Sequence, residues 1–441
     1  MNRLRDSHPT LFFVLPVMLE CLLSTGAGLI FSYLIGGISG SALTTISLGN
    51  QVINLIVAMA TMLVTGSGIL CARLLGGGEQ MEASKIVEQT LFLSAVAGIA
   101  VTTLCLIFAG PLMTLLMPNA EPVVLAEGIA FFRVLILSLP FVFLTNSVSS
   151  TLRASGDSRS PMVITFTVCG LQLFFAWILL RVLGMDVMGA GLVYLLCRIG
   201  GTSIALYILL HSHRYHLNAR RMLQPDKAAF KRILSVGIPT SVESIFVQTG
   251  YLVANSMVIG LGTFEAAAYN VANTLYSFAS LVQSISSSVA MTLVGQLIGA
   301  KAYKQARKTG WTIWGVGMSA SLFLSAMLLV FGNQLAPIYT SDPGVQAAAV
   351  ASLWAVFVMC IPAISLNTLD PQLRVGGDVK YVMYVTIIAV WAIRLPATWL
   401  FCYHWHWGAA GVFWANTVSL FFRMILNGAR YIKGKYLYMR V

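Results

Sequence analysis

The fold is decided by an apolar segment that occurs twice, as Leu15-Pro16-Val17-Met18-Leu19-Glu20 and again as Ile238-Pro239-Thr240-Ser241-Val242-Glu243. Three further landmarks recur at nearly the same distance along the chain: Arg73-Leu74-Leu75-Gly76 with Gln296-Leu297-Ile298-Gly299, Pro140 with Pro362, and Leu152-Arg153-Ala154-Ser155-Gly156-Asp157 with Leu373-Arg374-Val375-Gly376-Gly377-Asp378. The offset stays at 221–223 residues across all four landmarks. This steady spacing predicts two repeated halves.

The composition indicates a protein whose surface mostly contacts lipid. Of its 441 residues, 58% are hydrophobic and only 10% are charged, whereas a soluble protein carries about 25% charged residues. Too few charges are present to cover a water-facing surface. The 27 Lys and Arg residues fall mostly in short gaps between long apolar runs. This placement predicts no nucleic-acid surface, which would need basic residues gathered on one soluble face.

Twelve apolar runs reach the length of about 20 residues that spans a bilayer core. They lie near 10–36, 43–72, 88–117, 124–150, 160–183 and 188–211, and then near 233–261, 265–297, 310–339, 346–372, 381–403 and 407–430. Six spans per half make both halves run in the same direction. The sequence therefore predicts two six-helix bundles related by a pseudo-two-fold axis along the membrane normal.

The basic residues also predict the orientation. With the N-terminus inside, most of the 27 basic residues lie in cytoplasmic gaps, and only Arg181 lies in an outside gap. The positive-inside rule then places both termini in the cytoplasm. The longest polar stretch, His211–Arg232, separates the halves. We expect an N-lobe over residues 1–219 and a C-lobe over residues 220–441.

Three acidic residues fall within the predicted spans: Glu20, Glu243 and Asp370. An ionisable group inside the bilayer costs about 2.5–3.5 kcal/mol at the helix centre, and such groups usually serve a site or a partner. The repeat makes Glu20 and Glu243 symmetry mates, so we expect both to face one central cavity. Desolvation favours the neutral carboxyl, so a proton and a bound cation would compete for it. The alternative is that each carboxylate satisfies a neighbouring buried arginine or a broken helix backbone.

Further polar residues are candidates for the cavity. Gln248 and Asn255 lie on the seventh span, and Asn273, Tyr276 and Gln283 lie on the eighth. Asn273 and Tyr276 are three residues apart and share one helix face. Hydrogen bonding between helices explains such residues equally well. Arg198 and Arg394 are central in their spans. We expect them to bond backbone carbonyls at breaks in the helices, or carboxylates of the same lobe. The alternative is that they indicate an anionic or zwitterionic substrate. Arg423 lies near a span end and can snorkel.

The ordered motifs resemble those of the multidrug and toxic compound extrusion (MATE) transporters, closest to the bacterial drug-exporter branch. The resemblance rests on the six-plus-six spans, Gly237-Ile238-Pro239 with Glu243, Gly295-Gln296-Leu297-Ile298-Gly299-Ala300-Lys301, the two Leu-Arg-x-x-Gly-Asp segments, and Ala72-Arg73-Leu74-Leu75-Gly76. It implies a functional Glu at the Glu243 position.

Two departures from the family pattern affect the site. The helix 10 Asp of the family stands about three turns before the Leu-Arg pair, whereas Asp370 is three residues before Leu373; Asp370 could instead cap the helix or pair with Arg374. In helix 1, Phe31 occupies the place of the usual proton-binding Asp, and Gln172 and Ala176 replace the Asn/Asp pair of helix 5. The N-lobe cation site is therefore missing in its usual form, and Glu20 is the candidate to replace it.

The expected function is secondary-active export of cationic, amphipathic organic compounds by proton or sodium antiport in a bacterial cytoplasmic membrane, by a monomer that rocks its lobes around a central cavity. A lipid-linked oligosaccharide flippase, an exporter of an anionic or zwitterionic metabolite, and a membrane-embedded enzyme or scaffold are the alternatives. No nucleotide-binding or nucleophile motif occurs, and no cofactor is expected. His404-Trp405-His406-Trp407 fits an interfacial aromatic belt better than a metal site.

Overall fold

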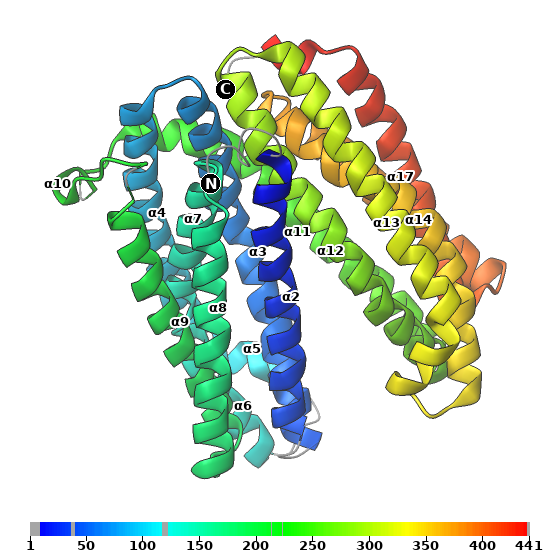
Figure 1. Cartoon of the computed structure of the whole chain (residues 1–441). Helices are drawn as coiled ribbons and strands as arrows, with labels where there is room; N and C mark the ends of the chain where they lie inside the picture. Colours follow the sequence, from blue (N-terminus) through cyan, green and yellow to red (C-terminus); the bar gives the residue numbers. More distant parts are fainter. Residues whose placement is uncertain (1–8, 37–39, 117–121, 213, 223, 439–441) are drawn as a thin grey trace. The chain divides into compact units, whose positions relative to one another are not determined.

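The computed structural model describes residues 9–36, 40–116, 122–212, 214–222 and 224–438. Every regular element in those ranges is a helix. The chain divides into two compact units, Met1–Gly237 and Ile238–Val441, and each is described by itself (Figure 1). The division lies inside a continuous helix. The lobes predicted as 1–219 and 220–441 stay a prediction.

The first unit is a bundle of long helices. α2 packs on α8, while α7 contacts α3, α4 and α9. Its elements are α2 (Pro9–Gly36), α3 (Gly40–Gly76), α4 (Gln80–Ile107), α5 (Ala109–Leu116), α6 (Pro122–Ile136), α7 (Leu139–Ala154), α8 (Arg159–Ala176), η1 (Trp177–Val182), α9 (Val187–Leu210), α10 (Ala219–Met222) and the start of α11 (Lys227–Gly260).

The second unit is built around α14, which packs against α12, α13 and α17. Beyond the rest of α11, its elements are α12 (Thr263–Gly299), α13 (Tyr303–Tyr339), α14 (Pro343–Val375), α15 (Val379–Ile388), η2 (Ala389–Arg394), α16 (Leu395–Trp399), η3 (Leu400–His404), α17 (Gly408–Ile432) and η4 (Lys435–Tyr438). A helix packed on three sides buries most of its residues. Polar groups on α14 are therefore held away from the surface of the unit.

Eleven helices in the described ranges are long and apolar enough to cross a membrane, and Val14–Gly28 is a shorter apolar stretch within α2. Together they agree with the twelve predicted spans. The observed helices run further at several ends than the apolar runs do, since α12 and α13 have 37 residues each. The predicted placement of both termini in the cytoplasm stays a prediction.

The polar stretch between the halves is bound to the first unit along much of its length. The Gln89 amide on α4 donates to the Arg221 and Gln224 carbonyls at 3.2 and 2.9 Å. Its oxygen accepts from the Asp226 amide at 3.0 Å. Beside it, buried Glu88 accepts from the Asn218 amide at 2.7 Å. The linker is therefore fixed to α4 by side chains that recognise its backbone.

A buried tyrosine follows the last long helix of each half. The Tyr215 hydroxyl donates to the Thr151 carbonyl at 2.6 Å, and burial raises the pKa of Tyr215 well above its ordinary value. Tyr436 is also buried and lies against Gly376 of the second Leu-Arg-x-x-Gly-Asp segment. Tyr215 and Tyr436 are 221 residues apart, the offset of the repeat itself.

Candidate functional site

Glu243 is buried on α11, four residues after Pro239. Its Oε1 accepts a hydrogen bond from Arg374 Nη2 at 2.8 Å and another from Thr386 Oγ1 at 2.8 Å. Its Oε2 is buried and has no hydrogen-bond partner among the described residues. Hydrogen bonds between charged groups are roughly twice as strong as neutral ones. The pair therefore fixes one oxygen of the carboxylate and leaves the other open.

Asp370 lies on α14 one turn before Arg374. Its Oδ2 accepts from Arg423 Nη2 at 2.7 Å, and its Oδ1 accepts from Asn427 Nδ2 at 2.7 Å, both from α17. The same Arg423 Nη2 lies 3.9 Å from Glu243 Oε1. Arg423 therefore links the two carboxylates, and the structure pairs Asp370 with Arg423 rather than with Arg374.

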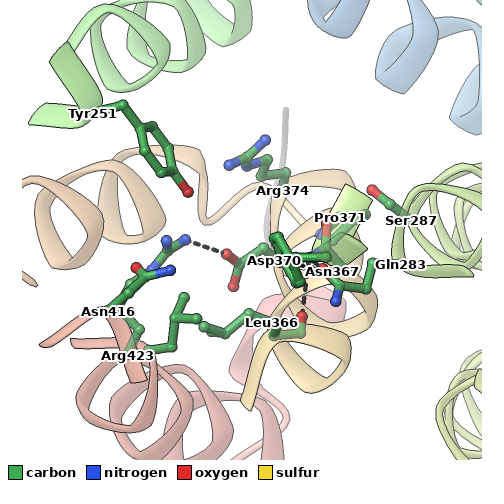
Figure 2. A pocket seen from close by; sticks show the side chains of 13 residues that line it. Tyr251, Gln283, Ser287, Leu366, Asn367, Asp370, Pro371, Arg374, Asn416 and Arg423 are labelled. Carbon is green, nitrogen blue, oxygen red and sulfur yellow. Dashed lines mark hydrogen bonds and ion pairs between the residues drawn. The ribbon is translucent and has the colours of Figure 1, made fainter. Parts of the chain in front are cut away.

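Asp370, Arg374 and Arg423 border a cavity of about 200 Å³ in the second unit (Figure 2). Glu243 is bonded to Arg374 but is not itself part of the cavity lining. Helices α11, α12, α14 and α17 each contribute to its wall. The lining is mostly polar and consists of Tyr251, Tyr276, Gln283, Ser287, Ala363, Leu366, Asn367, Asp370, Pro371, Arg374, Asn416, Leu420 and Arg423. Because a polar cavity enclosed by apolar helices is costly, this one is the candidate site for a ligand or an ion.

The first unit holds a matching ion pair. Arg153 Nη1 donates to both oxygens of Glu20, at 2.8 and 2.9 Å, and Thr165 Oγ1 donates to Oε1 at 3.1 Å. Each of the three residues has its counterpart in the second unit at the repeat offset. One difference separates the two: Arg153 bonds both carboxylate oxygens of Glu20, whereas one oxygen of Glu243 has no partner within the described ranges.

Phe31 lies in an apolar core within the first unit. It is 2% exposed, and its ring meets that of Tyr194 edge-on, with centroids 5.1 Å apart. Ala176, the counterpart of a family polar residue, belongs to the same cluster, together with Leu180 and Ala190. The surroundings of Phe31 in the described part of the first unit are therefore apolar. The loss of the N-lobe cation site and its replacement by Glu20 stay predictions.

The predicted polar residues divide into two groups. Tyr276 and Gln283 line the cavity, and the Tyr276 hydroxyl donates to Gln283 Oε1 at 3.2 Å. Asn273 is exposed, and Gln248 and Asn255 are partly buried; none of the three lines the cavity. Their roles stay predictions.

Arg198, Arg394 and Arg423, and also Arg133 of the predicted span near 124–150, lie in different places. Arg394 is 2% exposed, and its guanidinium carbon lies 3.9 Å from the centre of the Tyr251 ring. Arg198 lies on α9 of the first unit and is not a lining residue of this cavity; its carbonyl accepts from the Thr202 hydroxyl. Arg133 is on α6. Arg423 does not snorkel to a surface: its side chain is largely buried and bonded to Asp370.

Sequence reasoning did not place Arg374, Asn367, Ser287 and Asn416 in the site. Arg374 had a usable signal, because it repeats Arg153 in the Leu-Arg-x-x-Gly-Asp segment just as Glu243 repeats Glu20. The other three are single polar residues in apolar helices and carry no such signal. Within the described ranges, no group of three or more His, Cys, Asp or Glu side chains is arranged to hold a metal ion.

Comparison with known proteins identifies relatives over nearly the whole chain. The sequence model of the MatE family matches residues 16–178 and 239–400. A Thermotoga maritima protein named "Probable multidrug resistance protein NorM" is 23% identical over 432 residues, covering 96% of this chain and 91% of its own. The Staphylococcus haemolyticus "Multidrug export protein MepA" is 23% identical over 428 residues, covering 94% of this chain and 91% of its own.

Solved structures agree on the fold. A Pyrococcus furiosus protein, described as a transporter of the MOP superfamily with a binding pocket of reverse polarity, superposes with a TM-score of 0.88 at 19% identity, covering 97% of this chain and 96% of its own. An outward-facing multidrug resistance MATE transporter superposes with a TM-score of 0.87 at 19% identity over the same shares. The all-helical membrane fold predicted from the repeat is confirmed.

Proposed function

Because the chain belongs to the MatE family of membrane transporters, which are not enzymes, we propose that it exports amphipathic organic cations by proton or sodium antiport. Two relatives, one named for multidrug resistance and one for multidrug export, support the export of varied organic compounds. The membrane would be the bacterial cytoplasmic membrane, and the transporter would act as a monomer. In this proposal the two lobes, residues 1–219 and 220–441, alternate access to a shared cavity.

One observation carries the coupling part of the proposal: the open oxygen of Glu243. A buried carboxylate oxygen without a partner in the described part of the chain carries a desolvation cost, and a proton or a sodium ion bound there would remove that cost. Protonation would also weaken the hydrogen bond between Arg374 and Glu243, since its acceptor would no longer carry a negative charge. Binding of the ion would in this way change the arrangement of the cavity wall.

Arg423 would extend the effect to Asp370. It lies within 4 Å of a carboxylate oxygen of each acid, so neutralising Glu243 would let Arg423 interact with Asp370 alone. Two guanidinium groups, from Arg374 and Arg423, are paired with these two carboxylates. Uptake of one proton makes the net charge of the cluster more positive by one, which would weaken the binding of an organic cation. Ion binding and cation release would then be linked, as antiport requires.

The alternative is that the pair only fastens α11 to α14. The pair of Glu20 and Arg153 supports this alternative, because it repeats the same contact with both carboxylate oxygens occupied. On the proposed function, the two acids differ in role: Glu243 exchanges ions, and Glu20 contributes as its partner in the first lobe.

The test uses everted or reconstituted vesicles containing the full chain. Ethidium added to energised vesicles should release protons, or the release should depend on sodium; the two results identify the coupling ion. The variant Glu243→Gln should abolish ethidium-driven ion release at wild-type protein level. Glu265→Gln is the matched control, because Glu265 is in the same unit but accepts from the Ala409 amide at 2.6 Å, away from the cavity. Unchanged coupling in Glu243→Gln would remove the proposed role.

The flippase alternative is tested in the same vesicles. Flipping of a polyprenyl-linked sugar, without any ion release on addition of organic cations, would replace the export proposal.

A further inference from the structure

The cavity of the second unit has hydrogen-bonding capacity that its own residues do not use, and Gln283 is the clearest case. Gln283 is 4% exposed. Its Oε1 accepts from the Tyr276 hydroxyl at 3.2 Å and from Asn367 Nδ2 at 3.4 Å. Because Asn367 Nδ2 also donates to the Ala363 carbonyl, the amide orientations are fixed. Gln283 Nε2 is left without a partner among the described residues, and it is a donor.

The two arginines that line the cavity add donors of the same kind. Arg374 and Arg423 give an Nη2 group to Glu243 and Asp370, while the Nε of each is buried without a hydrogen-bond partner in the described part of the chain. Asp370, the carboxylate on the lining, has both oxygens occupied. Among the lining residues that the structure describes, the buried side-chain atoms without a hydrogen-bond partner are therefore all donors, which suits a ligand with a hydrogen-bond acceptor.

The charge around the cavity points the same way. Arg394 lies over the ring of Tyr251, a lining residue. With Arg374 and Arg423 it makes three guanidinium groups against the two carboxylates Glu243 and Asp370. A buried positive charge without a counter-ion is strongly unfavourable. One negative group bound in the cavity would balance the cluster.

We propose that this cavity binds the carboxylate of the transported compound, so that the substrates are amphoteric rather than purely cationic. The inference rests on the proposed export function, whose cationic substrates it makes more specific. The cavity measures about 200 Å³, below the roughly 300–1,000 Å³ of pockets that enclose a whole drug-sized ligand. It therefore accommodates an end group, and the rest of the compound lies beyond it.

The test compares two dyes that differ only at this group. Rhodamine 110 carries a free carboxyl, and rhodamine 123 is its methyl ester. Their equilibrium binding to the purified full chain in phosphatidylcholine nanodiscs is followed by fluorescence anisotropy, without an ion gradient. The wild type should bind rhodamine 110 at least about tenfold more tightly, as a hydrogen bond to a charged group implies. Equal affinities, or tighter binding of the ester, would overturn the proposal.

Two variants assign any preference to the cavity. Gln283→Leu should lower the ratio of the two affinities severalfold, because it removes a donor to the carboxylate and so weakens binding of rhodamine 110 more than binding of rhodamine 123. Gln346→Leu makes the same chemical change in the first turn of α14, where Gln346 donates to the Thr340 carbonyl and does not line the cavity, and it should keep the wild-type ratio. A wild-type ratio in Gln283→Leu would place the carboxylate site elsewhere and refute the assignment.

Two further measurements separate a substrate carboxylate from a lipid headgroup, and the binding site from the export function. Adding phosphatidylglycerol to the nanodiscs tests whether a lipid headgroup occupies the cavity. If the preference for rhodamine 110 over rhodamine 123 is lost in these nanodiscs, the cavity binds lipid phosphate and not the carboxylate of a substrate. Transport of both dyes in vesicles with an ion gradient tests the export function. If neither dye moves but the binding preference holds, the export proposal fails and the carboxylate site stands.

Discussion

The contact between Glu243 and Arg374 can be measured by a double-mutant cycle. The single variants are Glu243→Gln and Arg374→Gln, and the double variant carries both. Glu243 is the more buried partner, with its side chain 6% exposed against 23% for Arg374. Removing one partner of a buried pair costs about 3–5 kcal/mol because the other charge stays behind. The partial exposure of Arg374 lowers this figure for Glu243→Gln, which leaves the arginine behind.

The two single variants should therefore differ. Arg374→Gln leaves the carboxylate buried with Thr386 and a guanidinium nitrogen 3.9 Å away, and we expect a loss of about 2–4 kcal/mol. Glu243→Gln keeps a hydrogen-bond acceptor of the same shape, and we expect about 1–2 kcal/mol. The double variant should lose less than the sum, with a coupling energy of about 1 kcal/mol or more.

The measurement is thermal unfolding of the purified protein in detergent. A thiol-reactive dye reports exposure of the buried Cys360 and Cys402 of the same unit. For a unit of about 200 residues, each kcal/mol corresponds to roughly 2–4 °C in the midpoint. On the same conversion, Arg374→Gln should lower the midpoint by roughly 4–16 °C, and Glu243→Gln by roughly 2–8 °C. Additive losses in the double variant would show that the pair does not act as a unit and would refute the reasoning.

Two further predictions concern the first unit and use the same thiol-reactive dye, which here reports exposure of the buried Cys71 and Cys197. Gly98→Ala should lower the unfolding midpoint, because the added Cβ would lie 2.7 Å from Pro140 Cα, and overpacking of this kind costs about 1–3 kcal/mol. The control is Gly170→Ala, which has open space around the added Cβ and should change the midpoint little. Equal effects of the two variants would contradict the close approach of α4 and α7. Tyr215→Phe should cost about 1 kcal/mol, the net value of its bond to the Thr151 carbonyl; an unchanged midpoint would mean that this bond adds nothing.

The repeat made part of the site predictable. Glu20 and Glu243 occupy matching positions, and so do Arg153 and Arg374, so each acid and its arginine belong to segments that recur together. This joint recurrence is a signal that an acid and an arginine of the same half form a pair. The charges along any single span do not contain that information, because partners on different helices meet only through packing.

Arg423 shows what the sequence could not provide. It stands near the end of an apolar run, where a long basic side chain usually reaches the membrane surface. Its actual partner, Asp370, is on another helix, and the contact depends on how α17 packs on α14. Similarly, a spacing of three places Asn273 and Tyr276 on one face. That spacing does not say which of the two borders the cavity, and only Tyr276 does.

The two buried tyrosines extend the repeat beyond the membrane spans. Tyr215 and Tyr436 stand at the same offset as the spans, and each packs beside the segment that follows the fourth span of its half. The repeated unit therefore comprises six spans and a short tail that packs beside them. In the first half, this tail is also the beginning of the stretch that joins the halves. That stretch is therefore a folded element of the first unit and not a free tether.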